Sequence, residues 1–248
     1  MKTACKTDGI LERGRVRMID KKAGKGEIML KGLVFDMDGL LFDTERIVQR
    51  SWNLSGADLG YCDIGAHIYN TIGFNRAKRE TYFKGVYGED FPHHMFQETA
   101  ARYFTEIVEK EGLPVKKGVG EILEFAKKHG LSIGLATSSS ADYALENLRS
   151  AGIYDYFDGY VCGNMIKKSK PDPEIYLKAC AAIGIEPSEA VALEDAPSGI
   201  ASAYAAGLRT VMVPDLVQPD EKTLAFVWRK ADSLLAVVPI LEKELAEN

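Results

Sequence analysis

Two carboxylic acids, Asp36 and Asp38, are separated by one residue and followed at once by Gly39. They come directly after the apolar run 33–35, which is typical of a short strand buried on both faces. On an extended chain, residues i and i+2 point to the same side, so both carboxylates can face one crevice. Two acids held this close do not both stay ionised comfortably unless a cation joins them. The alternative is a simple acidic turn, because Asp-Gly pairs often mark turns.

Polar groups capable of chemistry also occur at three later points, two of them directly after apolar runs and the third directly before a proline. They are Thr137 and Ser138 after residues 131–136, Lys170 directly before Pro171, and Glu194 with Asp195 after residues 190–193. Each has an ordinary structural alternative, namely a helix cap or a solvated lysine. The carboxyl ends of parallel strands share one edge of a sheet, so the four groups together predict a single site there.

The elements that would position these groups alternate between strand and helix after residue 118. The patterns predict helices over 119–129, 141–151, 173–183, 197–206 and 234–246, and strands over 131–136, 160–161, 190–193 and 210–213. Several of the helices are followed by glycine, and two begin with proline. Strands alternating with helices of this length imply an α/β fold with a doubly wound parallel sheet.

A different pattern separates the first strand from this alternating region. Residues 45–113 are rich in aromatic side chains and show helical periods, with no segment typical of a buried parallel strand. They are expected to form an all-helical cap domain inserted into a core made of residues 29–44 and 114–248. Residues 1–28 are basic and lack periodicity, and we expect a flexible N-terminal extension there.

Composition narrows the class of protein. The chain has 248 residues with 46% hydrophobic and 27% charged side chains, as in ordinary globular proteins. A net charge of −5 argues against nucleic acid or an anionic membrane as a partner. No apolar run approaches the roughly 18 residues of a membrane span. The four cysteines lack the spacing of a metal site and indicate free thiols in a cytoplasmic protein. The sequence does not indicate an oligomeric state, and we take a monomer as the default.

The segment DMDG at residues 36–39, followed by Asp43 and Thr44, resembles the first motif of the haloacid dehalogenase-like hydrolase superfamily. The helical-cap subfamily, which includes β-phosphoglucomutases and sugar-phosphate phosphatases, is the nearest match. The groups at Thr137, Lys170 and Glu194 correspond to the second, third and fourth motifs, in order. The resemblance covers the chain from residue 30 onward and implies that the partner is a small phosphorylated metabolite.

This resemblance implies a role for each acid. Asp36 would be the nucleophile that forms an aspartyl phosphate, and Asp38 would act as general acid and then general base. The cofactor would be Mg²⁺, held by the Asp36 carboxylate, the backbone carbonyl of Asp38 and the Asp195 carboxylate, with Glu194 close by. Lys170 would pair with both the phosphate and Asp36.

The resemblance also implies the residues that hold the substrate. Thr137, the backbone N–H of Ser138 and the loop at Gly39 would contact the phosphate. In the cap, Gly73 followed three residues later by Arg76 is similar to the substrate-specificity loop of the family. A guanidinium there could clamp a second phosphate or a carboxylate, although an ordinary surface arginine at a helix start is the alternative.

The predicted function is a Mg²⁺-dependent phosphatase of small metabolites, such as sugar or nucleoside monophosphates. The alternative is a β-phosphoglucomutase that uses the same nucleophile. Family mutases carry a histidine at the position of Val48 and a lysine soon after the second-motif hydroxyl, where this chain has Ser139 and Ser140. A dehalogenase is disfavoured by the acids at Asp38 and Asp195, and a receiver module by the length and the insertion.

Overall fold

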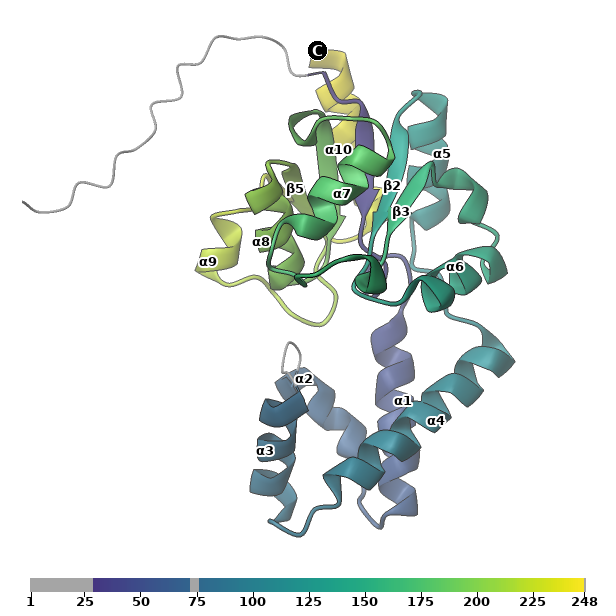
Figure 1. Cartoon of the computed structure of the whole chain (residues 1–248), viewed down its shortest axis with the longest axis vertical. Helices are drawn as coiled ribbons and strands as arrows, with labels where there is room; N and C mark the ends of the chain where they lie inside the picture. The colour runs from purple at the N-terminus through teal and green to yellow at the C-terminus, as the bar shows by residue number, and fades with distance from the viewer. Residues whose placement is uncertain (1–28, 72–75, 248) are drawn as a thin grey trace, which may run out of the picture.

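The computed structural model describes residues 29–71 and 76–247, and its central element is a six-stranded sheet in which every strand pair is parallel (Figure 1). The strand order is β3-β2-β1-β4-β5-β6. The strands are β1 Gly32–Phe35, β2 Ser132–Ala136, β3 Gly159–Val161, β4 Ala190–Glu194, β5 Arg209–Met212 and β6 Arg229–Lys230. The predicted doubly wound α/β core is therefore confirmed.

Helices cover both faces of this sheet, which explains why its central strands are apolar throughout. Helices α7 (Glu174–Ala182) and α8 (Pro197–Ala206) pack on one face. The other face is covered by α5 (Val119–Lys128), α6 (Ala141–Ser150) and α10 (Leu234–Glu247). All residues of β1 and β4 are buried, as expected for strands with helices on both sides.

The strand order reverses between β1 and β4. The chain runs outward from β1 through β2 to β3, then returns to place β4 on the other side of β1. A crevice opens at the carboxyl ends of the strands at such a reversal, and ligands of doubly wound sheets bind there. The polar residues that end β1 and β4 therefore lie at the position where this topology favours a binding site.

The cap lies between β1 and α5 in the sequence and is entirely helical in the part of the chain that the structure describes. Its α-helices are α1 (Thr44–Asp58), α2 (Ile68–Thr71), α3 (Arg76–Tyr87) and α4 (His93–Glu111). Helices α1 and α4 cross at an angle and pack against each other (Figure 1). The interior is aromatic, and Phe83 lies at its centre, with ring centroids 5.3–5.5 Å from those of Trp52, Phe91 and Phe96.

Two neighbouring segments connect the cap to the sheet domain. The backbone N–H of Asp43 donates to the carbonyl of Pro114, and that of Lys116 donates to the carbonyl of Leu41. Leu216, in the loop after β5, packs against the aromatic interior of the cap. The two parts thus meet at the paired linkers and at this loop.

The sequence patterns did not predict two short elements, α9 (Glu221–Leu224) and β6, at the side of the sheet that β6 forms. Helix α9 is a single turn, and β6 contains two exposed residues, so neither leaves a periodic pattern. The extension expected over residues 1–28 and most of the expected specificity loop, residues 72–75, lie outside the described residues. Among the helices that are described, none combines the length and apolar character needed to cross a membrane.

The aromatic interior of the cap generates a stability prediction. Phe83→Ala removes a fully buried ring, and such truncations cost about 3–5 kcal/mol. Chemical denaturation should show this loss in the free energy of unfolding. Tyr69→Ala is the matched control, because Tyr69 is 57% exposed on the same domain and its loss should cost under about 0.5 kcal/mol. Equal losses in the two variants would contradict this packing.

Candidate active site

The ammonium group of Lys170 lies between two carboxylates at the carboxyl edge of the sheet. Its Nζ is 2.5 Å from Oδ1 of Asp36, at the end of β1, and 2.6 Å from Oε1 of Glu194, at the end of β4. It also donates to the backbone carbonyl of Ala136, the last residue of β2, at 3.0 Å. One side chain thus links the ends of three neighbouring strands, and only 7% of it is exposed.

Both carboxylate oxygens of Glu194 accept hydrogen bonds. Its Oε1 accepts from the hydroxyl of Tyr176, on α7, at 2.9 Å in addition to Lys170. Its Oε2 accepts from the backbone N–H groups of Asp195 and Ala196 at 3.1 and 3.0 Å. With both oxygens occupied in this way, Glu194 is better placed to fix Lys170 than to bind a metal directly.

Tyr176 and Lys170 make a second contact. The ammonium lies 5.1 Å from the centroid of the fully buried Tyr176 ring, within the range of a cation–π interaction. Burial disfavours the charged form of Lys170, but the carboxylates of Asp36 and Glu194 outweigh that effect and raise its pKa. The side chain therefore stays protonated and supplies a fixed positive charge beside Asp36.

Asp38 faces the same crevice through a separate contact. Its Oδ2 accepts a hydrogen bond of 2.6 Å from the hydroxyl of Ser139. The backbone N–H of Ser139 in turn donates to Oγ1 of Thr137 at 3.1 Å, so the loop after β2 fixes the side chain of Asp38. Burial raises the pKa of Asp38 above its ordinary value, which favours a carboxyl that can carry a proton.

Three acids are close enough to share a cation. Ligand oxygens of Asp36, Glu194 and Asp195 all lie within 4.8 Å of one another. Burial raises the pKa of Asp36 and of Asp195, and the neighbouring carboxylates add to the effect. A hard divalent cation would relieve this repulsion, and carboxylate oxygens are the donors that Mg²⁺ prefers. The donor set therefore fits Mg²⁺, with Asp36 and Asp195 as the side chains best placed to bind it.

Gly39 allows a close approach between the loop after β1 and Asp195, which the sequence alone did not show. Its backbone has a φ of +82°, and a Cβ there would overlap the carboxylate of Asp195. A residue without a side chain is needed both for this conformation and for the close approach. Gly39 therefore lets the acid at the end of β4 reach the acids at the end of β1.

The structure brings most of the predicted site residues to one edge of the sheet and leaves one apart. Asp36, Asp38, Gly39, Lys170, Glu194 and Asp195 are joined by the contacts above, and Thr137 with the exposed Ser138 lies on the adjoining loop. Arg76 begins α3 as an exposed residue and does not line the groove of the cap. Arg79, one turn later, does line it.

Several neighbours of the site were missed by the sequence analysis. Ser139 is the third residue of a run of hydroxyls and carried no signal that set it apart from Ser138. Tyr176 resembled an ordinary core residue of an amphipathic helix. Gly199, on α8, packs so closely on Glu194 that a Cβ would overlap the carboxylate. Only the fold shows that these residues meet at the acids.

Comparison with known proteins shows extensive similarity. Residues 33–213 match the family model described as haloacid dehalogenase-like hydrolase. The chain is 32% identical over 188 residues to the phosphorylated carbohydrates phosphatase of Thermotoga maritima, covering 73% of this chain and 84% of that one. It is 30% identical over 185 residues to hexitol phosphatase B of Escherichia coli K12, covering 73% and 82%.

Solved structures are also similar. CbbY from Rhodobacter sphaeroides, in complex with phosphate, aligns with a TM-score of 0.66 and 26% identity, covering 84% of this chain and 96% of that one. The β-phosphoglucomutase of Clostridium difficile shares the fold at a TM-score of 0.66 and 21% identity, covering 88% and 98%. The similarity spans the sheet domain and the cap together.

The packing of Gly199 on Glu194 predicts that alanine has opposite effects on stability at two glycines that lie near helix starts. Gly120→Ala, near the start of α5, meets open space and should raise the free energy of unfolding by up to about 1 kcal/mol. Gly199→Ala must displace Glu194 and should lower it by about 1–3 kcal/mol. Urea denaturation of both variants measures the difference. An equal gain in both would show that Glu194 is not confined.

Proposed function

This chain belongs to the haloacid dehalogenase-like hydrolase family, and on that premise we propose that it is a Mg²⁺-dependent phosphatase of phosphorylated carbohydrates. The observation that carries the proposal is the pair of acids directly after β1, each of which makes a different contact. Asp36 is bound to Lys170, and Asp38 is bound to Ser139. One acid is thus placed beside a fixed positive charge and the other can carry a proton. The names of the phosphatase relatives support the substrate class.

In the proposed reaction, a carboxylate oxygen of Asp36 attacks phosphorus and forms an aspartyl phosphate. The bond from phosphorus to the carbohydrate oxygen breaks, and Asp38 donates its proton to that oxygen. Asp38, now a carboxylate, accepts a proton from water as the water attacks phosphorus. The bond from phosphorus to Asp36 breaks, which releases phosphate and regenerates the Asp36 carboxylate. The proton taken from water leaves Asp38 protonated for the next cycle.

Other residues of this edge would stabilise the transferred group. The ammonium of Lys170 offsets negative charge that develops on the phosphoryl oxygens. Thr137 and the backbone N–H of Ser138, in the loop after β2, are expected to hold two of these oxygens. Mg²⁺, held by the carboxylates of Asp36 and Asp195 and the backbone carbonyl of Asp38, would neutralise charge on the phosphate and orient it for in-line attack.

The cap would complete the site. Residues 45–113 would form the cap domain and residues 29–44 with 114–248 the core, with hinge motion at the paired linkers. Closure of the cap over the sheet edge would exclude bulk water during the first transfer. The protein is proposed to act as a cytoplasmic monomer.

The phosphoglucomutase alternative is weaker on the residues that this chain carries. Val48 lines the groove of the cap with an apolar side chain where family mutases have histidine. Ser139 is bound to Asp38, in the stretch where those mutases have lysine. Hydrolysis of the aspartyl phosphate requires neither of these groups.

An assay of two products in one tube tests the proposed function against this alternative. The substrate is β-glucose 1-phosphate with Mg²⁺ and a trace of the 1,6-bisphosphate, and both inorganic phosphate and glucose 6-phosphate are measured. A phosphatase would release phosphate without forming glucose 6-phosphate. It should also release phosphate from hexitol phosphates. Formation of glucose 6-phosphate without matching phosphate would instead establish a mutase.

The nucleophile assignment predicts that Asp36→Asn abolishes turnover, because the amide cannot attack phosphorus. The loss in kcat should be at least about 1,000-fold, comparable with the removal of other covalent nucleophiles. Circular dichroism should show an unchanged fold. Near-normal turnover in Asp36→Asn would rule out Asp36 as the nucleophile.

The metal assignment predicts that a chelator abolishes activity and that added Mg²⁺ restores it. Asp195→Asn weakens one ligand and should raise the Mg²⁺ concentration for half-maximal activity at least about tenfold. Asp232→Asn is the control, because Asp232 is exposed and outside the acidic cluster. An unchanged Mg²⁺ requirement in Asp195→Asn would remove this residue from the metal site.

A further inference from the structure

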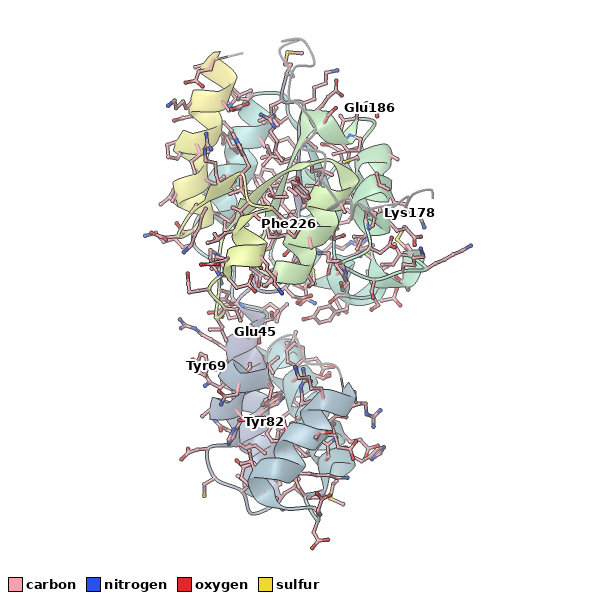
Figure 2. The ribbon with its side chains drawn as sticks, turned by 90° about the vertical axis from the view of Figure 1, so that its left-hand side faces the viewer. Glu45, Tyr69, Tyr82, Lys178, Glu186 and Phe226 are labelled. Carbon is pink, nitrogen blue, oxygen red and sulfur yellow. The ribbon has the colours of Figure 1, made fainter. Side chains whose placement is uncertain are left out.

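The cap contains a groove of about 470 Å³, lined by residues of α1, α2, α3 and α4. Glu45, at the start of α1, lines this groove and also lines a small cavity together with Asp195. Figure 2 places Glu45 at the junction between the helical cap and the sheet domain. Glu45 therefore lies between the groove and the catalytic edge, and the part of a substrate beyond its phosphate would lie in the groove on the cap side of Glu45.

The charges of this groove nearly cancel. Among its described lining residues, Glu45 supplies one carboxylate and Arg79, on α3, supplies one guanidinium. Arg79 lies over the ring of Trp52, with its Cζ 5.4 Å from the centroid. Burial lowers the pKa of Arg79, and the electrostatic effect of Glu45 opposes this. Burial and the nearby Asp215 and Asp38 raise the pKa of Glu45, and Arg79 and Lys116 oppose this effect. Arg79 and Glu45 thus each favour the charged form of the other.

The groove offers hydrogen-bond acceptors to a ligand. The hydroxyls of Ser51, Thr71 and Thr105 all line it, and each donates to a backbone carbonyl three or four residues earlier in the chain. Their oxygen lone pairs are left for a ligand, as are those of the Glu45 carboxylate. Hydroxyl groups can donate to such acceptors, whereas a second phosphate or a carboxylate is an acceptor only. Apart from Arg79 and the amide of Gln97, the remaining wall is apolar and includes Trp52, Phe96 and Phe104.

We propose that Glu45 and Arg79 act as a compensating charge pair that makes the enzyme select uncharged, polyhydroxylated leaving groups over those with a second anionic group. Glu45 repels an anion in the groove, while Arg79 limits this repulsion and is not available as a free clamp. The inference rests on the proposed phosphatase function and narrows its substrate class. It also moves the specificity role from Arg76, which is exposed, to Arg79 and Glu45.

Two substrates that differ at one terminal carbon test this selection. Glucitol 6-phosphate ends in a hydroxymethyl group, and 6-phosphogluconate ends in a carboxylate. The native enzyme should favour glucitol 6-phosphate in kcat/KM by at least about tenfold, as expected for one like-charge repulsion in a partly buried site. The ratio of the two kcat/KM values is unaffected by the fraction of enzyme that is folded or by changes in the chemical step.

The two variants of the pair should move this ratio in opposite directions. Glu45→Gln removes the repulsion and should shrink the preference about tenfold, whereas Arg79→Gln leaves Glu45 unopposed and should enlarge it. Glu98→Gln makes the same charge change on an exposed part of α4 and should leave the ratio unchanged. General damage to the cap would not shift the ratio in opposite directions.

Several outcomes would overturn the inference. They are equal use of the two substrates by the native enzyme, shifts of both variants in the same direction, and hydrolysis of p-nitrophenyl phosphate with no hydrolysis of either sugar derivative. In each of these cases the phosphatase function itself would stand. Release of phosphate from none of the three compounds would instead contradict the proposed function, and the inference with it.

Discussion

The buried ion pair of Lys170 with Asp36 is the contact on which the rest of this site depends. Acids at the ends of β1 and β4 are forced together by the reversal of strand order between these strands. Uncompensated, such a group of buried carboxylates would be strongly destabilising. Lys170 supplies one positive charge between Asp36 and Glu194, and Tyr176 and two backbone N–H groups satisfy the rest of Glu194. The remaining negative charge on Asp36 and Asp195 is what makes this edge of the sheet suitable for Mg²⁺.

The cap and the sheet domain carry different kinds of functional groups. The sheet edge holds acids, a lysine and a metal-binding set, which suit a phosphoryl group whatever it is attached to. The groove of the cap carries a single carboxylate and a single guanidinium among its described residues, with hydroxyl oxygens and aromatic rings around them. Glu45 lies at the boundary, since it lines cavities on both sides. In the proposed function the residues at the strand ends carry out the chemistry and the helices of the cap select the substrate, with two short linkers joining the parts.

The sequence predicted the features that depend on neighbouring residues in the chain, and it did not predict those that depend on contacts across the fold. The strands other than β6, the longer helices beside them and the polar residues directly after β1, β2 and β4 were predictable, because apolar runs and their ends are local features. Ser139, Tyr176 and Gly199 were not, because each is defined by what it touches across the fold. Arg79 was missed for a related reason. One helical turn separates it from Arg76, and only the packing of α3 on Trp52 decides which of the two enters the groove.

The most direct test of the central claim is to trap the phosphoryl group on the protein. The enzyme is mixed with glucitol 6-phosphate and Mg²⁺, quenched in acid within a turnover, digested and examined by mass spectrometry. Asp38→Asn, tested with p-nitrophenyl phosphate because its leaving group departs without a general acid, cannot activate the attacking water and should increase the trapped fraction. The added mass of one phosphoryl group is expected on Asp36. Phosphate released with no labelled peptide in either protein, or a label on another residue, would contradict it.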